Sequence, residues 1–350
     1  MVKDAWFSAS RLCEEKSVNR LSSEIIDSAK KVDSFIEQIV DINNEPQSLY
    51  RASRQIIDAG GKRLRPFLVL KSCKLVNGRQ EDAIPTASAL ELLHTFTLIH
   101  DDIMDQDKKR RGVPTVHTEW GVPIAIVAGD LLFAKVYDII ARYTDTKNVK
   151  PKRILQVIKE ISEATIALCE GQTRDMMFEK KETVSEKEYL EMIQGKTAAL
   201  FETSARCGGI LGGGKKKQVE RLGTFGNYSG MAFQIIDDVL ALTADEKILM
   251  KPVGNDIREG KRTLMVIYAL QKAKTNQRQK ILKTLGNKDA TTEQIQETIR
   301  VIDSLGGINY AKRLAEKYIK KAKKALTIFP DSHDREDLLS LSELIFDRQH

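Results

Sequence analysis

The stretch KRILQVIKEISEATIALCEGQTRDMMFEKK, residues 152–181, contains no proline and is rich in residues that favour helices. It opens a longer span, between Pro151 and Pro252, that is rich in Ala, Leu, Ile, Glu and Lys and also lacks proline. Because proline breaks the interior of a helix, about a hundred residues without it indicate long helices. This span is the strongest sign of the fold class.

Apolar residues recur at helical spacing outside this span as well, whereas no sustained two-residue alternation is bounded by hairpin turns. Glycine and proline interrupt the helical segments at short connections, and none is long or biased enough to be a domain linker. The sequence therefore predicts an all-α fold, with a mobile N-terminal segment over residues 1–18 and one domain over 19–350. The clearest apolar stripes are Leu21, Ile25, Val32, Ile36 and Ile39, and Leu314, Tyr318, Ala322, Ala325 and Leu326.

The composition is that of a globular protein, with 41% hydrophobic and 30% charged residues in a chain of 350. No apolar run approaches the ~18 residues that a membrane span needs, so we expect no stable membrane insertion. The first residues, MVKDAWFSASRLCEEKS, are too polar for a signal peptide, which predicts a cytoplasmic protein. Four scattered cysteines without CxxC pairing indicate neither a zinc site nor a disulfide framework.

A net charge of +7 suits an anionic partner: nucleic acid, an anionic membrane or a phosphorylated small molecule. The basic residues are spread along the chain, only 6% of the residues are aromatic, and no nucleic-acid-binding module is recognisable. We therefore expect no nucleic-acid partner.

Two segments place adjacent aspartates inside apolar runs: LIHDDIMDQD, residues 98–107, and FQIIDDVLALTADEK, residues 233–247. On a helix, Asp101 and Asp105 lie on one face, about 6 Å apart along the axis. A bound cation relieves the repulsion of two such carboxylates, and hard oxygen ligands beside substrate phosphates suit Mg²⁺. Asp102 points about 100° away, which predicts an outer carboxylate that does not itself bind the metal.

In the second segment, the spacing lets Gln234 and Asp237 face one cavity, with Asp238 beside them. A single Asp-Asp pair is usually a solvated helix face. Two pairs, each embedded in Ile, Leu, Val and Phe, favour a metal site instead.

Basic residues near glycines supply matching anchors for a polyanion. A glycine turn opens GGKRLRP, residues 60–66, and such a turn brings backbone N–H groups and guanidinium donors to one phosphate-sized locus. Each cation alone is most often a solvated surface charge, but with two acidic helices they suggest a diphosphate held by metal and by Lys/Arg. The other cations of this kind are those of KKRR, residues 108–111, and Lys196, Lys251 and Lys261.

In this order, the segments resemble the trans-isoprenyl diphosphate synthases, or polyprenyl synthetases, most closely those of the archaeal short-chain geranylgeranyl type. The resemblance spans roughly residues 20–345. The joint occurrence of five elements makes it specific. The elements are GGKRxRP at Gly60–Pro66, DDxxD at Asp101–Asp105 with Arg110-Arg111-Gly112, QGKT at Gln194–Thr197, FQxxDD at Phe233–Asp238, and K…GxD…GK at Lys251, Gly254, Asp256, Gly260 and Lys261.

The resemblance implies antiparallel helices around a deep central cavity, the isoprenoid synthase fold, in a homodimer. The two aspartate motifs would face each other across the cavity mouth. The implied reaction is head-to-tail, 1'-4 condensation of isopentenyl diphosphate with an allylic diphosphate (dimethylallyl, geranyl or farnesyl), dependent on two or three Mg²⁺ ions per site.

The resemblance also implies a role for each matched residue. The metal ligands would be Asp101, Asp105 and Asp237. The allylic diphosphate would be bound by Arg110, Lys196, Lys251 and Lys261, and isopentenyl diphosphate by Lys62, Arg65, His94 and Arg111. Thr197 and Gln234 would line the reaction centre.

Product length depends on a bulky residue beside the first aspartate helix. In this family, an aromatic residue five positions before the motif is typical of short-chain archaeal-type enzymes, and Phe96 stands there. Helical geometry leaves two interpretations open, since Thr97 lies closer to the Asp101 stripe and Phe96 could be a core aromatic. We expect geranylgeranyl diphosphate (C20) as the product, with farnesyl diphosphate (C15) as the alternative.

Two other function classes compete with this one. A non-catalytic subunit of a heteromeric synthase typically lacks the DDxxD aspartates or the basic anchors, which are present here. A class I terpene cyclase would leave the GGKRxRP element and His94 without a role. Ala241, where many family members carry a third aspartate of the second motif, is interpreted as tolerated variation.

Overall fold

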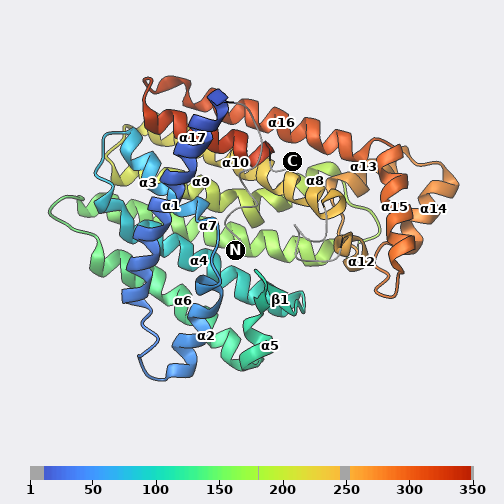
Figure 1. Cartoon of the computed structure of the whole chain (residues 1–350), viewed down its shortest axis with the longest axis horizontal. Helices are drawn as coiled ribbons and strands as arrows, with labels where there is room; N and C mark the ends of the chain where they lie inside the picture. Colours follow the sequence, from blue (N-terminus) through green and yellow to red (C-terminus); the bar gives the residue numbers. More distant parts are fainter. Residues whose placement is uncertain (1–11, 180, 245–252, 348–350) are drawn as a thin grey trace. The chain divides into compact units, whose positions relative to one another are not determined.

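The computed structural model describes residues 12–179, 181–244 and 253–347, and of residues 12–19 it describes the backbone alone (Figure 1). The described chain is almost wholly helical, which confirms the all-α prediction. The proline-free span holds two of the longest helices, α7 (Pro151–Glu179) and α10 (Lys216–Thr243). Of the predicted mobile segment 1–18, residues 1–11 lie outside the described residues and the rest begin α1, so its mobility stays a prediction.

The other long elements follow in chain order. The helices are α1 (Leu12–Ile39), α2 (Gln47–Asp58), α3 (Leu64–Leu75), α4 (Ile84–Met104), α5 (Val116–Trp120), α6 (Val122–Tyr143), α8 (Glu186–Ile193), α9 (Ala199–Leu211), α12 (Asn255–Glu259), α13 (Leu264–Lys272), α14 (Thr275–Thr284), α15 (Thr292–Ser304), α16 (Gly307–Ala325) and α17 (His333–Asp347). Shorter elements are the 3₁₀ turns Glu81–Ala83 and Leu326–Ile328, the π-helix Gln194–Ala198, and strands β1 (Lys109–Arg110) and β2 (Val113–Pro114).

The chain divides into two compact units. Unit 1 comprises Met1–Glu160, Ser204–Glu220 and Ile328–Leu341, and unit 2 comprises Ile161–Thr203, Arg221–Thr327 and Ser342–His350. The first aspartate motif belongs to unit 1 and the second to unit 2. The prediction of one domain over 19–350 stays a prediction.

Unit 1 is built around α4, which packs against α1, α3 and α6. Most of the first ten residues of α4 are buried, and Leu90, Leu92 and Leu93 are wholly so. Burial of these side chains fixes the helix in the core, each Leu stabilising the fold by about 1.5–3 kcal/mol. The predicted stripe on α1 faces the same core, with Val32 and Ile36 fully buried. The carboxyl end of α4, where the aspartates lie, is thereby held on a rigid base.

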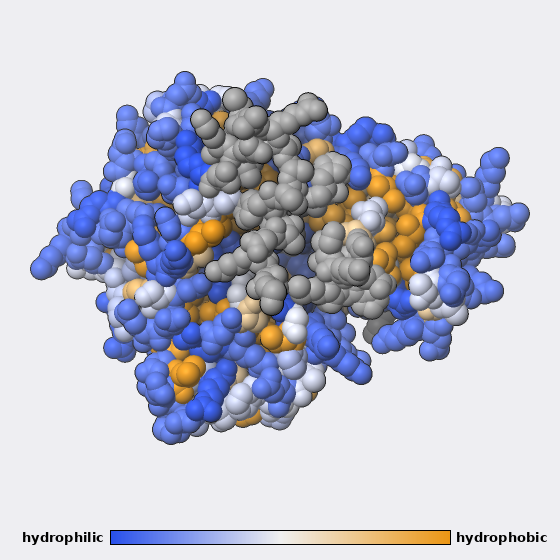
Figure 2. Space-filling model, in the orientation of Figure 1, coloured by the Kyte–Doolittle hydropathy of each residue, from blue (hydrophilic) through white to orange (hydrophobic). Residues whose placement is uncertain are grey.

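Unit 2 holds most of α7 and α10, and within it α13 contacts α8, α15 and α16, and α14 contacts α15. Figure 2 shows a mostly hydrophilic surface, with apolar residues gathered in the region of α12 and α13. Among the residues that the structure describes, no helix is both long and apolar enough to span a membrane.

Candidate active site

The first aspartate motif lies at the carboxyl end of α4. The backbone N–H of Asp105 donates to the carbonyl oxygen of Asp101 at 2.8 Å, so the two residues keep the predicted spacing of one helical turn. The Asp101 side chain is 20% exposed, whereas that of Asp102 is 1% exposed. Asp101 is therefore accessible to a ligand and Asp102 is not.

Asp102 is buried against Arg110. The Nε and Nη2 atoms of Arg110 each lie 2.6 Å from Oδ1 of Asp102. Burial nonetheless raises the pKa of the Asp102 carboxyl to about 6, against the opposing effect of Arg110. The expectation that Asp102 is an outer carboxylate agrees with this burial. The structure adds that its partner is a residue that we assigned to the allylic diphosphate.

A two-residue hairpin presents Arg110 and Arg111. Strands β1 and β2 pair Lys109 with Pro114 and Arg110 with Val113. Arg111 and Gly112 form the turn with φ of +52° and +81°. Positive φ at both central residues matches the right-handed twist of a hairpin, and Gly112 adopts it without strain.

The GGKRLRP element forms the turn between α2 and α3, and Gly61 makes it compact. A Cβ at Gly61 would lie 2.8 Å from Nη1 of both Arg63 and Arg111. Arg111 also donates to the carbonyl oxygens of Ile56 and Gly60. The glycine therefore lets two guanidinium groups approach the turn.

The cations of this turn have different environments. Arg63 is 3% exposed and forms ion pairs with Asp33 at 2.8 Å and Glu91 at 2.9 Å, so it holds the fold together. Lys62 directly precedes Arg63, and Arg65 is the second residue of α3, so both flank a residue that is anchored by ion pairs. The roles of Lys62 and Arg65 in binding stay predictions.

His94, on α4, is affected by the positive charges of several arginines. Its pKa is held well below the ordinary value, first by burial and then by the positive charges of Arg65, Arg111, Arg110 and Arg63. The charges of Arg65 and Arg111 thus act on His94, and all three are among the four residues predicted to bind isopentenyl diphosphate. Arginines gathered around a neutral histidine suit a phosphate group.

In unit 2, the QGKT element is a π-helix, Gln194–Ala198, between α8 and α9. Such turns occur frequently at functional sites. A Cβ at Gly171 of α7 would lie 2.2 Å from the backbone nitrogen of Lys196, and one at Gly195 would lie 2.6 Å from the carbonyl oxygen of Ala167. The two glycines therefore let α7 and the π-helix touch backbone to backbone. That contact brings Nζ of Lys196 within 2.5 Å of Asp175.

The second aspartate motif lies on α10 and contacts the π-helix. The hydroxyl of Thr197 donates to Oε1 of Gln234 at 2.7 Å, and Nε2 of Gln234 donates to Asp238 at 2.8 Å. Asp238 is 9% exposed, and burial raises the pKa of its carboxyl to about 7. Gln234 thus bonds to Asp238, while the adjacent Asp237 is partly exposed. The assignment of Asp237 as a metal ligand stays a prediction.

The K…GxD…GK element is described only in part, because Lys251 lies outside the described residues. Gly254 and Gly260 flank α12 with φ of +72° and +82°. Lys261 lies 2.8 Å from Glu259 and 3.9 Å from Asp256. Its role in diphosphate binding stays a prediction.

The donor set suits Mg²⁺. Within the described residues, no group of three or more His, Cys, Asp or Glu side chains is arranged to hold a metal ion. Mg²⁺ is usually held by one or two carboxylates together with phosphate oxygens, and not by an all-protein cage. Asp101 on α4 and Asp105, which directly follows this helix, lie one turn apart, and Asp101 is accessible, so the pair fits that requirement.

Phe96 packs in an aromatic cluster with α6. Its ring centroid lies 5.2 Å from that of Phe133 and 4.7 Å from that of His100, and Phe133 contacts Tyr137 in turn. Phe96 is partly exposed, so it is not a wholly enclosed core residue. A role in limiting product length stays a prediction.

The sequence reading missed two partners that the structure reveals, Asp175 and Tyr189. Asp175 pairs with Lys196, and the sequence signal available for it was the polar run GQTRD near the end of α7. Tyr189 is 1% exposed, and its hydroxyl donates to Oδ2 of Asp238 at 2.6 Å. No sequence signal distinguishes it from an ordinary core tyrosine.

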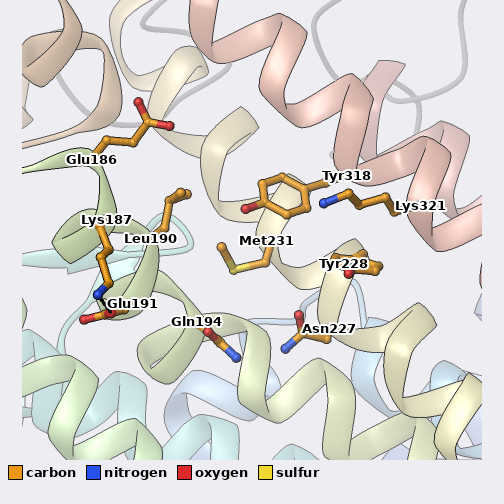
Figure 3. A pocket seen from close by; sticks show the side chains of 10 residues that line it. All are labelled: Glu186, Lys187, Leu190, Glu191, Gln194, Asn227, Tyr228, Met231, Tyr318 and Lys321. Carbon is orange, nitrogen blue, oxygen red and sulfur yellow. Dashed lines mark ion pairs between the residues drawn. The ribbon is translucent and has the colours of Figure 1, made fainter.

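A pocket of about 610 Å³ lies in unit 2 among α8, α10 and α16 (Figure 3). Leu190 and Met231 contribute its apolar part, and Tyr228, Tyr318 and Lys321 gather on one side. Gln194, the first residue of the π-helix, also lines it. The pocket lies among the elements that carry Thr197 and Gln234.

Comparisons with known proteins agree with the motifs. The model of the family described as polyprenyl synthetase matches residues 46–302. The chain is 38% identical to a geranylgeranyl diphosphate synthase of Methanosarcina mazei, over 94% of this chain and 98% of the relative. It is 39% identical to a geranylfarnesyl diphosphate synthase of Aeropyrum pernix, over 91% of this chain and 99% of the relative. A crystal structure of geranylgeranyl pyrophosphate synthetase from Pyrococcus horikoshii Ot3 is similar with a TM-score of 0.88 and 45% identity, covering 96% of this chain and all of that one.

Proposed function

The chain belongs to the polyprenyl synthetase family, and we propose that it condenses isopentenyl diphosphate head-to-tail with allylic diphosphates to form geranylgeranyl diphosphate. The observation that carries this proposal is the placement of Arg111 beside the glycine turn at Gly61 and of Arg110 against Asp102 in the first aspartate motif. Such a locus binds a diphosphate beside carboxylates that suit Mg²⁺.

The reaction requires charge stabilisation followed by exclusion of water. Breaking the allylic C–O bond leaves a carbocation and a diphosphate. Arg110, Lys196, Lys251 and Lys261 bind the leaving diphosphate and stabilise its developing charge. Asp101, Asp105 and Asp237 would hold Mg²⁺, which would supply further positive charge there.

Isopentenyl diphosphate is the second substrate. Lys62, Arg65, His94 and Arg111 hold its diphosphate, so that its double bond faces the carbocation. Attack forms the new C–C bond, and a proton then leaves for the released diphosphate. Thr197 and Gln234 line the reaction centre, which must exclude water because water would quench the carbocation.

The test is incorporation of labelled isopentenyl diphosphate by the purified protein with Mg²⁺ and dimethylallyl, geranyl or farnesyl diphosphate. We expect a C20 product that disappears on addition of EDTA. No incorporation with any primer would contradict the proposal and favour a non-catalytic subunit. A C15 product would indicate farnesyl diphosphate synthesis, and a C25 product would indicate the specificity for which the Aeropyrum pernix relative is named.

Phe96 limits product length in this proposal. Phe96→Ala should lengthen the products, because it removes a bulky side chain from the aromatic cluster on α4. Phe35→Ala is the matched control, since Phe35 is also partly exposed in unit 1 and pairs with an aromatic ring, that of Tyr143. Unchanged products from Phe96→Ala would remove Phe96 as the limiting residue.

We also propose that the protein is a cytoplasmic homodimer. Three large apolar residues at the start of α6 are 42–49% exposed, namely Val122, Ile126 and Val127. An exposed apolar group of this kind marks a protein–protein contact. Light scattering should give twice the chain mass, and Ile126→Asp should lower it to that of the monomer.

A further inference from the structure

A buried line of hydrogen bonds connects three elements of unit 2. It runs from Tyr189 on α8 to Asp238 on α10, back to Gln234 on the same helix, and on to Thr197 of the π-helix. The three donor–acceptor distances are 2.6, 2.8 and 2.7 Å. Thr197 and Gln234 are the two residues assigned to the reaction centre, whereas Tyr189 has no assigned role.

The chemistry of Asp238 sets the direction of every hydrogen bond in this line. One oxygen of Asp238 accepts from the Tyr189 hydroxyl, and the other accepts from the Gln234 amide nitrogen. The Gln234 amide then has a single orientation, with Oε1 turned toward Thr197. The hydroxyl of Thr197 donates its hydrogen to Gln234 Oε1, so the lone pairs of the Thr197 oxygen point away from Gln234.

Tyr189 is suited to be the fixed end of the line. It is 1% exposed, and burial together with Asp238 raises the pKa of its hydroxyl well above the ordinary value. The hydroxyl therefore remains a donor, and the ring is held by its packing. The next residue, Leu190, lines the open pocket of Figure 3.

We propose that Tyr189 is a positioning residue, which acts through Asp238 to fix the orientation of Gln234 and Thr197 at the reaction centre. This inference rests on the proposed function. Without the Tyr189 hydroxyl, Asp238 keeps only the Gln234 donor, so the carboxylate that orients the Gln234 amide is fixed at one oxygen alone. If Gln234 moves, the Thr197 hydroxyl is displaced and no longer presents its lone pairs to the developing carbocation. The chemical step then slows, while substrate affinity is kept.

The test compares two tyrosines that each lose one hydroxyl. Tyr310, also in unit 2, donates to both carboxylate oxygens of Glu186 at 2.8 and 2.9 Å, away from the line. Tyr189→Phe should lower kcat about tenfold and change both KM values less than about threefold. Tyr310→Phe should leave kcat within about twofold of the wild type. Equal kcat values for the two variants would overturn the proposal.

A double variant separates positioning from mere support of the fold. If Tyr189 acts through Thr197, the losses in Tyr189→Phe and Thr197→Val should not multiply in the double variant. Multiplied losses would assign Tyr189 a structural role only. If Tyr189→Phe does not fold, Asp238→Asn, which also frees the Gln234 amide, should lower kcat instead, and an unchanged kcat would overturn the proposal. A wild type inactive with every primer overturns the proposed function and this inference together.

A separate observation concerns the charge of α16. Its 19 residues hold seven basic side chains against one acidic side chain, a net charge of +6 where the whole chain carries +7. The buried residues of α16, among them Ala311, Ala315 and Ala322, form one stripe, so the cations lie on the opposite half. Lys320 pairs with Glu316, and Lys323 pairs with Glu343. Among the described residues, the other five basic residues have no acidic partner within ion-pair distance.

We infer that this basic face of α16 docks on an anionic lipid surface. The face is about 28 Å long, which suits a flat array of head groups. Lys321 lies over the rings of Tyr228 and Tyr318 at 5.1 and 5.3 Å, and tyrosines are enriched where proteins meet the membrane interface. A membrane would also accept an isoprenoid chain released as product.

Sedimentation with vesicles tests this inference. The protein should bind phosphatidylglycerol vesicles at low salt and not phosphatidylcholine vesicles, and high salt should release it. The triple variant Lys317→Glu, Lys321→Glu, Lys324→Glu should weaken binding at least about tenfold.

The matched control changes Lys215, Lys216 and Lys217 to Glu, an exposed basic run in unit 1. It should keep most of the binding. Equal losses in the two triple variants would show an effect of net charge alone and overturn the inference. So would absence of vesicle binding, or binding of the α16 face to DNA in preference to the vesicles.

Discussion

The two aspartate segments look alike in sequence but are held in different ways. In both, the second aspartate of the pair is buried and the first is partly exposed. Asp102 on α4 is held by the guanidinium of Arg110, with a second oxygen that is buried and has no hydrogen-bond partner among the described residues. Asp238 on α10 is held at both oxygens by neutral donors, Tyr189 and Gln234.

This difference indicates that the two segments contribute to function in different ways. Arginines surround the first segment and can stabilise a polyanion as well as the buried aspartate. In the second segment, the buried carboxylate accepts from two neutral side chains, one of which, Gln234, we propose to line the reaction centre. We therefore expect substitutions in the first segment to affect charge stabilisation, and substitutions in the second to affect positioning.

The largest expected effect is on turnover, from Asp101→Asn. The amide keeps the shape of the side chain but removes the charge of one of two carboxylates on α4, so kcat should fall about 100- to 1,000-fold. Asp237→Asn, the matched change on α10, should lower kcat about tenfold, because it removes one charge from the lesser segment. Steady-state kinetics over a range of Mg²⁺ concentrations would measure both. Equal reductions in kcat for the two variants would contradict the expectation that the first segment contributes more to turnover than the second.

The next effect is on stability without substrate. Asp102→Asn removes the nearest and most buried of the charge partners of Arg110, leaving Asp107 at 3.7 Å and Asp101 at 4.0 Å, and breaking such a buried pair costs about 3 kcal/mol. Asp238→Asn removes a buried charge that has only neutral partners, so its cost should be about 1 kcal/mol. Urea unfolding of both variants would measure the difference in the free energy of unfolding. A larger loss for Asp238→Asn would reverse the comparison.

These partners also show what the sequence could and could not predict. The proline-free span and the apolar stripes predicted the all-α fold, because helical periodicity is a local property. The spacing of Asp101 and Asp105 was predictable for the same reason. The contact between Asp238 and Tyr189 could not be predicted, because the two residues lie 49 positions apart in the sequence and the contact depends on tertiary packing.

The arginines show the same limit. The sequence marked GGKRLRP as basic, but it could not separate Arg63, which is buried in ion pairs with Asp33 and Glu91, from its neighbours. It assigned Arg110 to a substrate without seeing that Asp102 already holds it. The sequence shows which charged residues a segment contains, whereas tertiary packing decides which of them remain accessible to a ligand.

A smaller effect should distinguish the arginine-rich segment by its pH dependence. Burial and four arginines keep the pKa of His94 well below 6.5, so the folded protein leaves it neutral while the unfolded chain protonates it. Because the unfolded state then binds more protons, stability falls as pH decreases below about 6.5, by up to about 1.4 kcal/mol per pH unit.

Urea unfolding at several pH values would measure this slope. His94→Gln should reduce the loss of stability below about pH 6.5. The control His333→Gln, which changes an exposed histidine on α17, should keep the wild-type slope. An unchanged slope in His94→Gln would show that the arginines do not affect His94 as the comparison requires.

The smallest expected effect concerns Ala241, where the second segment departs from the family pattern. Its carbonyl oxygen accepts from the backbone N–H of Gly254 at 2.9 Å, so its backbone helps to hold the start of α12 against α10. Since Asp238 already has two donors, the second segment keeps its order without a third aspartate. Ala241→Asp should therefore change kcat less than about twofold, even at limiting Mg²⁺. A several-fold increase in kcat at limiting Mg²⁺ would instead mean that the natural alanine weakens metal binding, and the second segment would then depend on charge as the first does.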